Sequence, residues 1–128
     1  MIVDTSVLCA ILFAESDRED LLQRLSRAER LRAPVTVLVE LGIVLDARDD
    51  PRASTFSAQL TELLGIEWEP ITVQLAEEAR RAHGRYGRGS GHPARLNFGD
   101  CFSYALARVT GEKLLFKGED FALTDVPR

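Results

Sequence analysis

Four acidic residues stand at positions where an ordinary surface carboxylate is not expected. They are spread along the whole chain: Asp4, Glu40, Asp100 and Asp120. Carboxylate oxygens are the ligands that hard divalent cations such as Mg²⁺ and Mn²⁺ prefer. A fold that brought these side chains together would therefore create a candidate metal site. Taken singly, each also has a purely structural interpretation.

Asp4 and Glu40 differ in their surroundings. Asp4 follows the apolar run Met1–Val3 and precedes Thr5 and Ser6, which is typical of a strand that ends at a helix cap. It is a cap or turn residue, or an active-site residue at the carboxyl end of a parallel strand. Glu40 lies beside the apolar face of a predicted helix, without a Lys or Arg three or four residues away. Because an unpaired buried charge costs several kcal/mol, Glu40 requires an ion-pair partner or a metal ion.

Asp100 and Asp120 both fall near predicted helix or turn boundaries. Asn97 followed by Asp100 resembles a capping arrangement at the start of a helix. Asp120 follows a predicted strand and a glycine turn, where an aspartate is common for conformational reasons alone. Glu119 is adjacent, so the fourth acid is either Glu119 or Asp120.

The elements that must position these acids can be predicted from apolar periodicity and from capping and breaking residues. Short apolar segments predict strands at Met1–Val3, Leu31–Pro34, Ile66–Ile71, Lys113–Phe116 and Leu123–Val126. Helical patterns cover residues 5–13, 17–29, 36–48, 51–64, 72–85 and 98–110, and the helix at 36–48 is expected to turn Val37, Leu38, Leu41, Val44 and Leu45 inward. This alternation predicts an α/β fold with three layers, a short and mainly parallel sheet flanked by helices. The whole of residues 1–128 is expected to form one domain.

A basic segment precedes Asp100. Residues 80–95 contain five arginines and no acid, and the part from Tyr86 to Arg95 holds three glycines and a proline, which predicts a loop. Arg85 and Arg88 are candidates to contact an RNA backbone, with Tyr86 as a stacking surface. The alternative is a solvated helix end with favourably placed cations. The net charge of −4 argues against a general polyanion-binding protein.

Other kinds of site are disfavoured. Two cysteines and two histidines do not suggest a zinc site, and Cys9 and Cys101 are expected to be reduced, buried thiols. No Ser–His–Asp or Cys–His nucleophile is evident. The apolar segment from Ser6 to Ala14 has no basic start and is too short to span a bilayer. It is interpreted as a buried first helix in a cytoplasmic protein without membrane attachment.

The four acids occur in a recognisable order. With Asp4-Thr5-Ser6, the run LNFGDCFSYALA and the turn KGEDF, the chain resembles the PIN-domain nucleases along nearly its whole length, and in particular the VapC-type toxins of bacterial toxin–antitoxin pairs. The resemblance implies that the metal-site acids of the family fall on Asp4, Glu40, Asp100 and Asp120. Thr5, Ser6 and Asn97 are supporting candidates: the hydroxyls would hydrogen-bond the cluster or simply cap the helix.

The resemblance also implies an activity and partners. The expected reaction is hydrolysis of RNA phosphodiester bonds with bound Mg²⁺ or Mn²⁺, which activates water and neutralises charge on the phosphate. The expected partners are a second copy of the chain and a small antitoxin, in a homodimer or a larger complex. The antitoxin is expected to cover the apolar N-terminal helices, where Leu8, Ile11, Leu12 and Phe13 form either a docking patch or ordinary core.

Two other functions remain open at this level. A PIN-like module could bind RNA or a protein partner without cutting, although the presence of all four acids speaks against that. A receiver-type phosphoacceptor domain has a similar length and pattern of elements. It would need an acidic pair after the first strand and an aspartate at the end of a central strand, whereas Asp4 stands alone.

Overall fold

The structure, a computed structural model, describes residues 1–128 as strands and helices in regular alternation. The strands are β1 (Ile2–Val3), β2 (Arg32–Pro34), β3 (Glu67–Glu69) and β4 (Leu114–Leu115). The helices are α1 (Thr5–Leu12), α2 (Arg18–Ser26), α3 (Thr36–Arg48), α4 (Pro51–Leu63), α5 (Val73–Tyr86) and α6 (Phe98–Thr110), followed by the 3₁₀ helix η1 (Phe121–Leu123). Each predicted helix is present, and four of the five predicted strands are.

The four strands form one sheet in the order β3-β2-β1-β4, and every neighbouring pair is parallel. Ile2 of β1 is the register partner of both Arg32 and Leu114. Parallel strands need crossover connections, which the helices provide. The predicted mainly parallel α/β sheet is therefore confirmed. The carboxyl ends of all strands lie at one edge, where functional groups of such folds collect.

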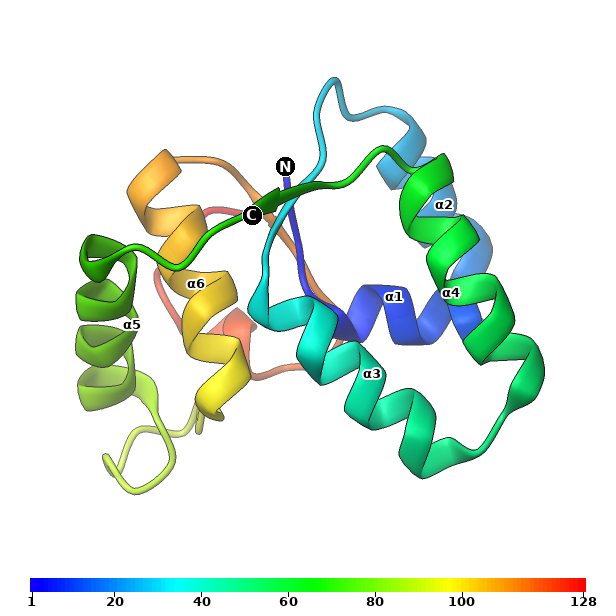
Figure 1. Cartoon of the computed structure of the whole chain (residues 1–128). Helices are drawn as coiled ribbons and strands as arrows, with labels where there is room; N and C mark the ends of the chain where they lie inside the picture. Colours follow the sequence, from blue (N-terminus) through cyan, green and yellow to red (C-terminus); the bar gives the residue numbers. More distant parts are fainter.

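The alternation of side chains along the two-residue strands β1 and β4 creates the three layers. Ile2 and Leu114 face a buried cluster built with α5 and α6, whereas Val3 and Leu115 face a second cluster built with α1 to α4. Figure 1 shows α5 and α6 together on one side of the sheet and α1, α2 and α4 on the other. A strand of two residues thus contributes one side chain to each core.

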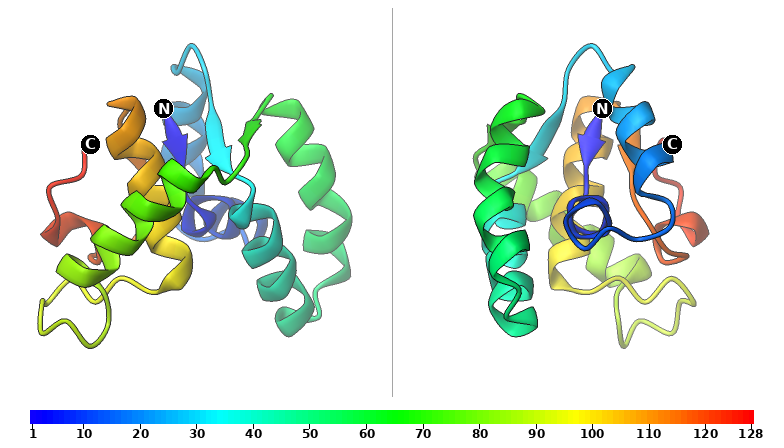
Figure 2. Two further views of the ribbon diagram at one scale, coloured as in Figure 1. Left: turned by 60° about the vertical axis from the view of Figure 1, so that its left-hand side comes forward. Right: turned by 90° about the vertical axis from the view of Figure 1, so that its right-hand side faces the viewer.

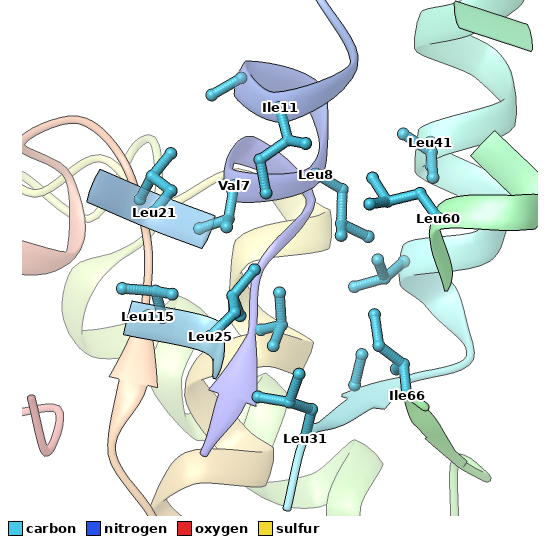
Figure 3. Packing of buried hydrophobic residues seen from close by; sticks show 14 of the residues in the cluster. Val7, Leu8, Ile11, Leu21, Leu25, Leu31, Leu41, Leu60, Ile66 and Leu115 are labelled. Atoms are coloured by element: carbon cyan, nitrogen blue, oxygen red, sulfur yellow. The ribbon is translucent and has the colours of Figure 1, made fainter. Parts of the chain in front are cut away.

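The first helix is central to the larger core. Val7, Leu8 and Ile11 of α1 are no more than 1% exposed and pack against leucines of the neighbouring helices (Figure 3). Figure 2 shows α1 end-on below the arrowhead of β1, because the chain turns sharply at Asp4. The predicted buried first helix is confirmed. Leu8 and Ile11 are core residues and are unavailable for docking, while Leu12 and Phe13 are partly exposed.

Three local predictions were wrong. Leu38 is 45% exposed, because the buried stripe of α3 runs through Val37, Leu41 and Leu45 and leaves residue 38 off that face. Tyr86 ends α5 rather than beginning the loop. Residues 123–126 form no strand: η1 and the buried side chains of Phe121 and Val126 anchor the tail instead.

No helix combines the length and the apolar character needed to cross a bilayer.

Candidate active site

The four predicted acids meet in one cleft of about 240 Å³ at the carboxyl edge of the sheet. They come from four separate segments: Asp4 follows β1, Glu40 lies on α3, Asp100 is in the first turn of α6, and Asp120 follows β4. Thr5, Ser6 and Asn97 also line this cleft. All seven residues proposed from the sequence for the cluster and its support are therefore brought together.

Asp4 is both a helix cap and a wall of the cleft. Its backbone is extended, and its Oδ2 accepts hydrogen bonds from the backbone N–H of Ser6 at 3.0 Å and from the Ser6 hydroxyl at 2.6 Å. The Ser6 hydroxyl in turn accepts from the backbone N–H of Lys117 at 3.0 Å. Ser6 thereby connects the ends of β1 and β4. Asp4 is only 4% exposed, so its orientation is tightly fixed.

Glu40 has no ion-pair partner; instead its Oε2 accepts a hydrogen bond of 3.0 Å from the Thr5 hydroxyl. Burial, and then the negative charge of Asp4, raise the pKa of Glu40, while the Thr5 hydrogen bond lowers it. On the other side lies Gly99, where a Cβ atom would collide with the Glu40 carboxylate. Gly99 therefore allows the start of α6 to approach α3 closely.

Asp100 closes a complete capping box. Its backbone N–H donates to Oδ1 of Asn97 at 2.9 Å, and its own Oδ2 accepts from the backbone N–H of Asn97 at 2.8 Å. Burial and the charges of Asp4, Glu40 and Asp120 raise the pKa of Asp100 to about 7, against the opposing effect of the Asn97 hydrogen bond. The cap role and the cleft role thus coexist in one side chain.

The structure distinguishes the two candidates for the fourth acid. Asp120 lines the cleft and its charge acts on Asp100, whereas Glu119 is exposed and does not line the cleft. Asp120 directly precedes η1, yet its side chain makes no capping hydrogen bond. Its carboxylate is therefore not committed to a structural contact within the protein.

The donor atoms suit a hard cation. In each of Asp4, Glu40 and Asp100, one carboxylate oxygen accepts hydrogen bonds from the chain. The other oxygen of each carboxylate accepts none and is not fully buried. As the side chains are placed, no three acidic, thiol or imidazole groups lie close enough together to hold a metal ion among them. Mg²⁺ retains several water ligands and needs only one or two direct carboxylates, so an open arrangement of this kind fits it.

The thiol in the cleft does not alter that preference. Cys9 lines the cleft, and both cysteines are free, as predicted. Burial, followed by the negative charges of Glu40 and Asp4, raises the pKa of the Cys9 thiol to about 11. Because a metal ligand must be the thiolate, Cys9 contributes little at neutral pH, and the available donors are oxygens.

Lys117 and Gly99 are not among the residues predicted for the site. Lys117 lines the cleft just beyond β4, so its position after a strand is the signal that could have identified it. Gly99 lies within the first turn of a helix, where glycine is unfavourable unless another group approaches closely. The acid cluster therefore has a neighbouring cation and a glycine that permits close packing.

The basic segment has a different arrangement from the one expected. Tyr86 is 7% exposed, and its ring packs against His92 and Tyr104 with the Arg85 guanidinium over it, so it is not an open stacking surface. Arg85 and Arg88 are exposed, but neither lines the cleft of the four acids. The aromatic residue was placed wrongly because a helix continues through Tyr86 and turns its ring into the core.

Comparison with known proteins identifies the family to which this chain is similar. The family model of the PIN domain matches residues 1–127. Ribonuclease VapC28 of Mycobacterium tuberculosis is 48% identical over 128 residues, which covers 100% of this chain and 96% of that protein. VapC ribonuclease Mb2780c of Mycobacterium bovis is 47% identical over 126 residues, with coverage of 98% and 96%.

A solved structure shows the same fold. The crystal structure of Mycobacterium tuberculosis VapC20, described as a sarcin–ricin loop cleaving toxin, superposes with a TM-score of 0.77 at 22% sequence identity. The match covers 98% of this chain and 95% of that one. The structural match shows the shared fold, and the family model together with the full-length relatives shows that the chain belongs to the PIN-domain family, among the VapC-type ribonucleases.

Proposed function

We propose that this chain is an endoribonuclease whose active site is the cleft of Asp4, Glu40, Asp100 and Asp120. The observation that carries the proposal is the convergence of these carboxylates from four separate segments, with unbonded oxygens open to the cleft. PIN-domain ribonucleases generally depend on a divalent metal. The oxygen donors of this site favour Mg²⁺ or Mn²⁺ over a thiophilic cation.

In the proposed reaction, a bound divalent cation supplies an activated water and offsets the charge that develops on the phosphate. The chain's own residues prepare the site. Thr5, Ser6 and Asn97 each fix one oxygen of a carboxylate and leave the second oxygen free. Because its pKa is raised to about 7, the Asp100 carboxyl is largely protonated below that pH in the metal-free protein. It must release this proton before it can act as a metal ligand.

The decisive experiment is cleavage by the purified protein. We expect hydrolysis of RNA with Mg²⁺ or Mn²⁺, arrest by EDTA, and no hydrolysis by Asp100→Asn. Because asparagine retains the oxygen needed to accept from Asn97, this variant should keep the helix cap and the fold. Undiminished cleavage by Asp100→Asn would refute the assignment of the site. RNA binding without cleavage in either metal would favour the non-cutting module.

The biological part of the proposal is that the enzyme is the toxin of a toxin–antitoxin pair. Its support is the high identity to full-length VapC ribonucleases. A small open reading frame next to the gene, whose product blocks cleavage when the two proteins are mixed, is the expected finding. If a purified neighbouring product neither binds nor inhibits the enzyme, the ribonuclease proposal stands and the toxin assignment fails.

We further propose that two copies associate through exposed apolar residues next to the cleft. Val39, Ile43 and Phe98 are 65%, 63% and 77% exposed, and they line a hollow that shares Glu40 and Asn97 with the cleft. Large exposed apolar side chains gathered in this way mark interaction surfaces. Light scattering should give the mass of a dimer for the purified chain and of a monomer for Ile43→Asp.

A further inference from the structure

Lys117 is the one lysine or arginine that lines the acidic cleft. Its backbone N–H donates to the Ser6 hydroxyl at 3.0 Å, so the residue is fixed at the end of β4 beside Asp4. Its ammonium group contacts Glu15 and also Asp17, the latter at 2.9 Å. These two acids lie between the end of α1 and the start of α2. Lys117 therefore has an anchored backbone and a side chain held by two anions.

The two ion pairs are poorly suited to a purely structural role. All three side chains are 34% to 37% exposed, and ion pairs exposed to this degree contribute little to stability because water and salt screen them. A lysine ammonium group on a flexible stem can exchange one oxygen partner for another at low cost. The contact is thus weak enough to be broken by a competing anion.

A substrate phosphate in this cleft meets strong negative charge. Four carboxylates surround the space, and the chain as a whole carries a net charge of −4. The arginines of the basic segment do not line the cleft. Lys117 is therefore the one basic residue that the protein itself places at the cleft that an RNA backbone would enter.

We propose that Lys117 binds a non-bridging phosphate oxygen of the RNA, and that Glu15 and Asp17 hold its ammonium group until that phosphate displaces them. This assignment of a substrate-binding residue rests on the proposed ribonuclease function. The substrate recognised at this point is the phosphate backbone and not a base, so the contact carries no sequence preference. In the free protein the two acids weaken RNA binding, and in the complex Lys117 is paired with the phosphate.

If the proposal is correct, removing the charge of Lys117 and removing the charges of Glu15 and Asp17 change the affinity for RNA in opposite directions. Binding of a labelled single-stranded RNA is measured by fluorescence anisotropy in the Asp100→Asn background, where cleavage does not interfere. Lys117→Met should weaken binding about tenfold, as expected for loss of one charge-assisted hydrogen bond, and reduce the salt slope by about 0.7. Lys117→Arg should restore most of the affinity. Glu15→Gln combined with Asp17→Asn should strengthen binding several-fold.

Two control variants distinguish a direct contact between Lys117 and a phosphate from a general effect of charge. Arg30→Met also removes a cation from an ion pair, with Glu67, but at the amino-terminal edge of the sheet; it should leave affinity and salt slope unchanged. Adding Lys117→Met to the variant at residues 15 and 17 should abolish the gain in binding. A gain that persists there would mean that the two acids act only by general repulsion, which would overturn the displacement of Glu15 and Asp17.

A purely structural ion pair predicts a different pattern. Breaking it from either side should then lower the melting temperature by similar amounts and change RNA binding in the same direction. That result would overturn the proposal. The test is independent of the ribonuclease proposal, because it measures binding in an inactive background, whereas failure of the proposed function would appear as absence of cleavage by the wild-type protein with metal.

Discussion

The Thr5 hydroxyl donates a hydrogen bond of 3.0 Å to Oε2 of Glu40, a residue 35 positions later in the chain. The contact joins the first turn of α1 to the middle of α3 and fixes the Glu40 carboxylate from one side. Gly99 leaves room for the same carboxylate from the other side. Glu40 is therefore oriented by two residues from different layers, and a change at either one should alter the site.

Gly99→Ala should impair both stability and cleavage. The added methyl group would overlap the Glu40 carboxylate, and the resulting displacement should cost about 1–3 kcal/mol of unfolding free energy. Gly42→Ala is the matched control, because it lies inside α3 with no atom near its added methyl group; it should stabilise the protein by about 1 kcal/mol. Urea unfolding of both variants measures the difference. Equal stabilisation by the two changes would contradict the close approach of α6 to Glu40.

Asp4→Asn should separate stability from activity. Asparagine caps a helix as well as aspartate does, so α1 should be retained. Removing one charge relieves repulsion with Glu40 and Asp100, and the metal-free variant should melt at a higher temperature than the wild type. Mg²⁺ or Mn²⁺ should stabilise the wild type and have much less effect on the variant. A lower metal-free melting temperature with an unchanged metal response would make Asp4 a structural cap only.

The stability of the metal-free protein should depend on pH through Asp100. Its pKa rises from the ordinary value of 3.8 to about 7 in the folded protein, so between these values the folded state binds more protons than the unfolded state. This contribution to stability is present at low pH and is lost as the pH rises toward 7. Glu40, whose pKa is also raised, acts in the same direction.

Unfolding in urea with EDTA, followed from about pH 4 to pH 7, measures this dependence. Asp100→Asn should flatten the decline, whereas Asp46→Asn, a change at an exposed position on α3, should leave it as in the wild type. Identical pH profiles for the wild type and Asp100→Asn would show that the Asp100 carboxyl is not the titrating group.

Substitutions in the basic segment should have different effects at its exposed arginines and at its buried tyrosine. Neutralising Arg85 and Arg88 together should flatten the salt dependence of RNA binding, because these exposed side chains are the candidate phosphate contacts of the segment. Tyr86→Ala should instead destabilise the fold by about 3–5 kcal/mol, since it removes a buried ring that packs on Tyr104. An unchanged salt slope for the arginine variant would leave these side chains as a solvated helix end.

The sequence predicted the elements well because their signals are local. Asn97 and Gly111 mark the ends of α6, and Pro51 marks the start of α4, so these boundaries follow from capping chemistry alone. Asp4 and Asp100 were ambiguous between cap and site, and the structure shows that each makes a capping hydrogen bond and also lines the cleft. What could not be predicted depends on packing between distant segments.

Lys117 and Tyr86 illustrate that limit. Nothing in the residues around Lys117 indicates that its partners are Glu15 and Asp17, about one hundred positions earlier. Tyr86 stands at the junction of a helix and a glycine-rich loop, and only the position of α6 decides that its ring is buried. Periodicity identifies a buried face reliably in the middle of a helix and poorly in its last turn.

The distribution of the four acids along the chain has a consequence for synthesis. Asp4 and Glu40 emerge early, but Asp100 and Asp120 belong to the last quarter of the 128 residues, and Asp100 is in the first turn of α6, which packs on the opposite side of the sheet from α1. A nascent chain on the ribosome thus holds only half of the cluster until α6 and β4 have been translated and have docked. The translating ribosome is itself built of RNA, and it meets no assembled cluster of four acids until the segment that carries Asp120 has left it.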